Sequence, residues 1–128
     1  MTNINDYISK VLQLTNNERK KYGLKELTID GALNSISAIR AKEIVISFSH
    51  TRPNGNGFWT VFNDQGVDYH IAAENLAMRQ PSPEDVVEAW MNSKGHRANI
   101  LNGDFKFIGI GVELDGNGKF YWTQHFKN

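Results

Sequence analysis

Histidine and carboxylate side chains are the groups with which this sequence could do chemistry, and the most suggestive of them is His96. It lies in the stretch EAWMNSKGHRANIL, from Glu88 to Leu101. The apolar spacing predicts a helix here that ends at Gly95, because glycine accepts backbone angles that a helix interior forbids. An imidazole just after such a turn can point into a cleft. A lone histidine is more often a surface or packing residue, so a site requires other residues to converge on His96.

The sequence contains no motif that fixes a reaction. It lacks the HExxH metalloprotease motif, the nucleophile elbow, the phosphate-binding P-loop and the EF-hand loop. It also contains no cysteine, which excludes thiol catalysis, thiolate metal sites and disulfides. The remaining candidates are scattered along the chain: His50, Glu74 beside Asn75, Ser93 and His96.

Length and charge set broad limits on what the chain does. Its 128 residues predict a single domain, 1–128, with a core of its own. Fourteen basic residues balance fourteen acidic ones, so no net charge draws it to nucleic acid or to an anionic membrane. No apolar run is long enough to span a membrane. The start, MTNINDYISK, lacks the regions of a signal peptide. We therefore expect either a cytosolic protein or the trimmed domain of an exported one, and the sequence does not indicate its oligomeric state.

Apolar residues at helical spacing predict the helices that must position these side chains. The first begins near Ile4, with Asn5 or Asp6 at its start and Gly23 as its C-cap. A second follows a cap at Thr28 or Asp30 and fades near Ile46. The run Ser82-Pro83-Glu84-Asp85 is a strong helix start, because a hydroxyl cap precedes proline and two acids. The buried stripe of that third helix consists of Val86, Val87, Trp90 and Met91.

The strands are expected mainly near the C-terminus. Apolar residues alternate with glycines from Ile108 to Leu114, and the glycine face leaves room for a close neighbour. The turn 115–118 then leads into KFYWTQHF, which completes an antiparallel hairpin. Residues 71–78 are interpreted as an extended or irregular segment, and His125 as a partly exposed strand residue. Helices without regular βαβ alternation predict an α+β domain with helices packed on an antiparallel sheet.

Five segments in register resemble the CAP superfamily, which comprises cysteine-rich secretory proteins, antigen 5 and pathogenesis-related proteins. They are LTNNERKKYGLKEL, FSHTRPNG, AAENLAM, AWMNSKGHRANIL and FIGIGVELDGNGKFYWTQHF. The resemblance covers about Val11 to Phe126 and is strongest to the small, cysteine-free, SCP-like bacterial members. It implies a three-layer α-β-α sandwich with a surface cleft that holds two histidines and two acids.

Matched residue by residue, the resemblance assigns His50 and His96 as the cleft histidines and Glu74 as the first acid. The second acid is expected three residues after Trp90, where this chain has Ser93. Glu88 does not replace it, because it projects about 130° from the centre of the apolar stripe and so faces solvent. Ser93, at about 90°, can line the cleft. A serine that only bonds backbone at a helix end is the alternative.

Two neutral imidazoles beside a carboxylate suit Zn²⁺ or another divalent cation. His50 and His96 would be the metal ligands, and Glu74 would bind directly or orient a histidine. Without a third strong ligand the site would be weak and open. A hydrogen-bonded polar cluster without metal is the structural alternative. Asn75 is expected at the cleft as an amide that ties neighbouring loops together.

The resemblance favours a non-enzymatic module that binds a small apolar, lipid-like or cell-envelope ligand. The alternative is a metal-dependent peptide or ester hydrolase, with His50, His96 and Glu74 as hypothetical catalytic residues. A serine nucleophile paired with His96 is weaker, since no oxyanion hole is evident. Because relatives are mostly exported, we expect an extracytoplasmic bacterial domain.

Overall fold

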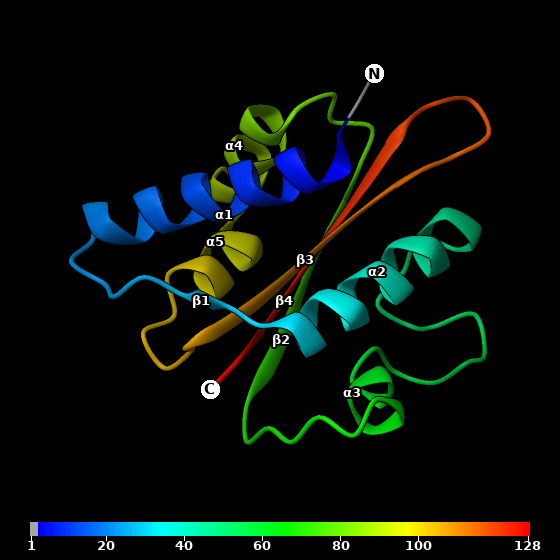
Figure 1. Ribbon diagram of the computed structural model, residues 1–128, viewed down its shortest axis with the longest axis horizontal. Coiled ribbons are helices and arrows are strands. Elements are labelled where there is room, and N and C mark those ends of the chain that lie inside the picture. The colour runs from blue at the N-terminus through cyan, green and yellow to red at the C-terminus, as the bar shows by residue number, and fades with distance from the viewer. Residues whose placement is uncertain (1–2) are drawn as a thin grey trace.

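The computed structural model describes residues 3–128, so Met1 and Thr2 of the predicted domain lie outside the described residues. The helices are α1 (Ile4–Lys21), α2 (Gly31–Ile46), α3 (Thr60–Asp64), α4 (Pro83–Met91) and α5 (Lys94–Ile100). The strands are β1 (Thr28–Ile29), β2 (Ala72–Met78), β3 (Phe107–Leu114) and β4 (Phe120–Lys127). Figure 1 shows α1, α4 and α5 on one side of the strands and α2 and α3 on the other. The predicted three-layer α-β-α sandwich is confirmed.

The sheet is mixed, with strand order β1-β3-β4-β2. The three long strands are antiparallel, as predicted, because β4 pairs antiparallel with both β3 and β2. The exception is β1, whose two residues pair parallel with the start of β3. The segment expected to be extended or irregular is the edge strand β2, which pairs through its whole length with β4.

Alternation along the strands divides the core between the two helical layers. Ile108, Ile110 and Trp122 are buried in the core cluster on the α1 and α4 side. The intervening Gly109 and Gly111 face α2, where a Cβ on either glycine would overlap the backbone of Leu33 or Ser37. Close packing of α2 on the sheet therefore explains why the apolar alternation is interrupted by glycine.

Helix starts follow the predicted capping chemistry with one change. Asp30 accepts the Leu33 N–H at the start of α2, and Ser82 accepts the Asp85 N–H at the start of α4. The cap of α1 is Asn3 rather than Asn5 or Asp6, since its side chain accepts the N–H groups of both. No helix in the part of the chain that the structure describes is long and apolar enough to cross a membrane.

Candidate functional site

A cavity of about 500 Å³ opens beside the edge strand β2. In the described part of the chain β2 is the last strand on that side of the sheet, and side chains from both helical layers line the cavity beside it. His50 comes from the loop after α2, and Ser93 and His96 come from the start of α5. Between them the apolar lining residues are Phe48, Leu76, Ala77, Met78, Ala89 and Trp90. The structure therefore brings the two predicted histidines and Ser93 to one hollow.

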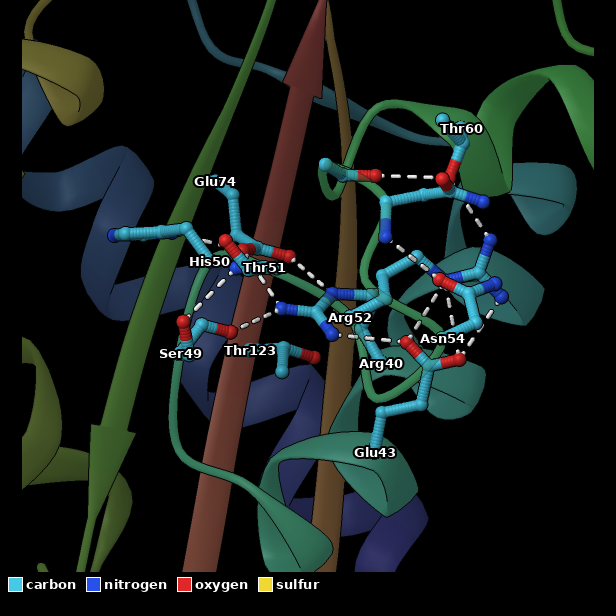
Figure 2. A network of polar contacts seen from close by, with 12 residues as sticks. Arg40, Glu43, Ser49, His50, Thr51, Arg52, Asn54, Thr60, Glu74 and Thr123 are labelled. Carbon is cyan, nitrogen blue, oxygen red and sulfur yellow. Dashed lines mark hydrogen bonds and ion pairs between the residues drawn. The ribbon is translucent and has the colours of Figure 1, made fainter.

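Glu74 lies behind this cavity at the centre of a buried polar network (Figure 2). Its Oε1 accepts hydrogen bonds from His50 Nδ1 at 2.8 Å and Arg40 Nη2 at 3.1 Å. Its Oε2 accepts from Arg40 Nε at 2.7 Å and His125 Nε2 at 2.7 Å. The Glu74 side chain is fully buried. All four contacts come from the protein itself, which leaves the carboxylate little capacity for a metal or a substrate.

These contacts fix the charge of Glu74. Burial by itself would raise the pKa of the carboxyl group, but hydrogen bonds from His125, His50 and Arg40 outweigh burial and hold the pKa well below its usual range. Glu74 is therefore an ionised acceptor at neutral pH and a poor general base. Its role in this geometry is to orient His50.

His50 is oriented by its carboxylate partner. An ionised carboxylate can only accept, so the Nδ1–H of His50 donates to Glu74. In the neutral form of the ring, the free electron pair then lies on Nε2. The side chain is 58% exposed although its partner is buried. His50 thus joins the buried network to the cavity.

His96 is held differently from the prediction. The helix that contains Trp90 ends at Met91, and Ser93 is the N-cap of the separate helix α5, so Gly95 and His96 lie inside a first helical turn. The expectation that Gly95 ends a helix is wrong. His96 Nδ1 and Ser93 Oγ are 2.9 Å apart, and Ser93 makes no side-chain bond to the backbone of its helix. Burial, and next the charge of His50, lower the pKa of His96, which favours a neutral ring.

Asn75 does not line the cavity. It is fully buried on the opposite face of β2 from Glu74. Its Nδ2 donates to the backbone carbonyl of His96 at 3.2 Å, and its Oδ1 accepts from Asn99 Nδ2 at 2.8 Å. The predicted cleft position is therefore corrected to a position behind α5, where the amide ties that helix to the sheet.

Two arginines that sequence reasoning missed hold the His50 loop (Figure 2). Arg40 Nη2 donates to the carbonyl of Ser49 at 2.6 Å, and Arg40 Nη1 pairs with Glu43 at 2.8 Å. Arg52 pairs with Glu43 at 2.9 Å and with Asp64 of α3 at 2.8 Å. One signal was available in the sequence: Arg40 is four residues from both Ile36 and Ile44, on the apolar stripe of α2.

His125 is the other residue whose role was missed. It lies in strand β4, as predicted, but it is fully buried rather than partly exposed. Its Nδ1 is 2.6 Å from Ser37 Oγ, and its Nε2 donates to Glu74. Burial follows from α2, which covers this face of the sheet. Glu88 is exposed, as predicted, and His70 is exposed as well.

Comparison with known proteins gives the family. The cysteine-rich secretory protein (CAP) family matches residues 12–126. The uncharacterised protein YkwD of Bacillus subtilis is 40% identical over 127 residues, which cover 98% of this chain and 48% of YkwD. The chain therefore belongs to the CAP family.

Solved structures agree with that assignment. An extracellular SCP-domain protein from Bacillus anthracis aligns with a TM-score of 0.85 and 29% identity over 98% of this chain and 41% of that one. An outer surface protein of Borrelia burgdorferi shares the fold, with a TM-score of 0.82 and 23% identity over 96% of this chain and 92% of that one. The chain spans less than half of YkwD and of the Bacillus anthracis protein.

Proposed function

We propose that this chain is an extracytoplasmic CAP domain whose cavity binds a divalent cation weakly through His50 and His96, together with a small apolar, lipid-like or cell-envelope ligand. One observation carries the proposal. Each histidine has its Nδ1 engaged by the protein, His50 with Glu74 and His96 with Ser93, and both rings line one cavity. Their Nε2 atoms are left for a bound molecule, as is the Oε1 of Gln80 in the same lining, which has no hydrogen-bond partner among residues 3–128.

The donor set fits an open metal site and not a closed one. Neutral imidazole nitrogens are good ligands for Zn²⁺. Within residues 3–128, no group of three or more histidine, aspartate or glutamate side chains is placed to hold a metal ion. Water or the ligand would complete the coordination, so binding would be weak. When bound, the cation would supply a positive charge that attracts an oxygen atom of the ligand. His96 can coordinate the cation when its Nδ1–H donates to Ser93, because its free electron pair is then on Nε2.

The cavity wall favours binding over hydrolysis. Phe48, Leu76, Met78 and Trp90 present apolar surface next to the two imidazoles, which suits a ligand with an apolar body and one polar end. Hydrolysis by a metal-activated water would need a free base, and the engaged carboxylate of Glu74 does not provide one. The extracytoplasmic location is supported by family neighbours that are extracellular or outer-surface proteins.

Calorimetric titration with ZnCl₂ tests the metal part. We expect one ion per chain, and an affinity at least about tenfold weaker in His50→Ala and in His96→Ala, because each removes one of two ligands. His70→Ala, which changes an exposed histidine outside the cavity, is the matched control and should bind like the wild type. If neither His50→Ala nor His96→Ala changes the zinc affinity, the proposed metal site is refuted. NMR titration with lipids and cell-wall fragments then tests the ligand part through shifts at Leu76 and Met78.

A further inference from the structure

A second cavity, of about 570 Å³, lies where α1 ends and β3 begins, and it shares no lining residue with the histidine cavity. Its apolar wall includes Leu24, Phe105 and Phe107. Its basic lining residues are Arg19, Lys25 and Lys106. Nothing in the family assignment or in the proposed metal site accounts for this combination.

Arg19 is a buried cation that has no carboxylate partner among the residues that the structure describes. It is 1% exposed. Its Nε donates to the carbonyl of Lys25 at 2.8 Å, and its Nη1 donates to the carbonyls of Ile100 and Asn102 at 2.8 and 2.9 Å. Its Nη2 has no hydrogen-bond partner among residues 3–128. Carbonyl dipoles at the end of α5 favour the charge but do not neutralise it, so the positive charge acts on the cavity at short range.

The other charges around the cavity add to that of Arg19. Lys25 and Lys106 are exposed, and neither forms an ion pair among the described residues. The single acid of the lining, Glu26, is paired with Lys20. Cationic groups therefore outnumber free carboxylates next to an apolar wall. Such a cavity attracts an anion, and the apolar part of an anionic ligand can pack against the apolar wall.

We propose that this second cavity binds a small amphiphilic anion, that is, a carboxylate or phosphate group joined to an apolar body. The anionic group lies next to Arg19, Lys25 and Lys106, and the body packs on Leu24 and the two phenylalanines. The volume is in the range of small-molecule sites, about 300 to 1,000 Å³. A ligand here is independent of the metal and of the histidine cavity.

NMR titration of the ¹⁵N-labelled protein tests this with defined probes. The first probe is 4-phenylbutyrate, which has an anionic group and an apolar body. Two incomplete probes serve for comparison: 4-phenylbutanol lacks the charge, and acetate lacks the apolar body. Phenyl phosphate, compared with inorganic phosphate, distinguishes the two anionic groups. We expect saturable shifts at the Arg19 side-chain Nε–H and the Gly103 amide with 4-phenylbutyrate or phenyl phosphate, and at least about fivefold weaker binding of the incomplete probes.

Variants at the rim keep the test independent of folding, because Arg19→Ala removes three hydrogen bonds of a buried side chain and would lower stability. The double variant Lys25→Glu, Lys106→Glu changes exposed residues and should weaken binding at least about tenfold. Lys119→Glu reverses one charge, against two in the double variant, in the β3–β4 turn, at the far end of β3 from the cavity, and should have less than about a twofold effect. Equal weakening by Lys119→Glu, equal binding of 4-phenylbutanol, or shifts only around His50 and His96 would each overturn the proposal.

Discussion

The substitution Glu74→Gln tests whether the buried ion pair holds the candidate site together. It keeps the size of the side chain but removes the charge that pairs with Arg40, and both side chains of that pair are fully buried. Breaking a buried pair typically costs about 3 to 5 kcal/mol, because the remaining charge is left without compensation. Arg40 would still bond Glu43 and the carbonyl of Ser49, so we expect the lower end of that range. In a domain of this size that corresponds to a drop in Tm of about 10 °C.

The assay is urea unfolding at several pH values, supported by thermal melts. Because the pKa of Glu74 is lowered in the folded state, its contribution is complete above the unfolded-state value, near 4.5, and is lost as the pH falls below it. The wild type should therefore lose stability on acidification by up to about 1.4 kcal/mol per pH unit from this group alone. Glu74→Gln lacks that contribution. The difference in free energy of unfolding between the wild type and this variant should therefore become smaller between about pH 5 and pH 3.

The matched control is Glu26→Gln, which removes the same charge from the exposed ion pair with Lys20. An exposed pair contributes at most about 1 kcal/mol, so this variant should unfold nearly like the wild type. If Glu74→Gln at neutral pH is no less stable than Glu26→Gln, the buried pair does not stabilise the fold as argued. If the difference in free energy of unfolding between the wild type and Glu74→Gln stays constant across the acidic range, the pKa of Glu74 is not lowered in the folded state as argued.

Three further predictions concern packing, hydrogen bonding and titration. Gly109→Ala should lower the free energy of unfolding by about 2 kcal/mol or more because α2 must move away from the sheet, whereas Gly116→Ala, with no atom near the added Cβ, should have little effect in the same urea assay. His125→Phe should cost about 2 to 3 kcal/mol by removing two buried hydrogen bonds, and a stability equal to that of the wild type would contradict the buried role. By NMR, the ring of His96 should titrate with a midpoint below 6.5, so its metal affinity should fall as the solution is acidified, and His50→Gln should move the midpoint upward. A midpoint at or above 6.5 would contradict the burial of His96.

Local patterns in the sequence predicted much of the fold. The sequence predicted a helix cap at Ser82 and one at Thr28 or Asp30, of which Asp30 is the cap, because capping depends on a side chain and on N–H groups only a few residues away. The alternation from Ile108 to Leu114 predicted strand β3 for the same reason. Helix ends were less predictable. Glycine can occur both at the end of a helix and within a helical turn, and Gly95 lies within the first turn of α5.

Long-range contacts limited the prediction of the site. The family resemblance selected His50, Glu74, Ser93 and His96, but not the contacts that give them their properties. Glu74 receives hydrogen bonds from residues 34 and 51 positions away in the chain. No local pattern specifies such distances, so the carboxylate could be expected to act as a base until its partners were known.

By itself, the sequence determined the classes of residue available, the absence of cysteine chemistry, most of the secondary structure and, through five matching segments, the family. The tertiary structure decided which of those residues meet. It brings His50, from the loop after α2, and His96, from α5 on the other side of the sheet, to one cavity beside the edge strand β2, and it encloses Glu74 among Arg40, His50 and His125. The reason is physical: charge state and hydrogen-bond capacity depend on the neighbours of a group in space, and those neighbours are brought together by packing across the sheet.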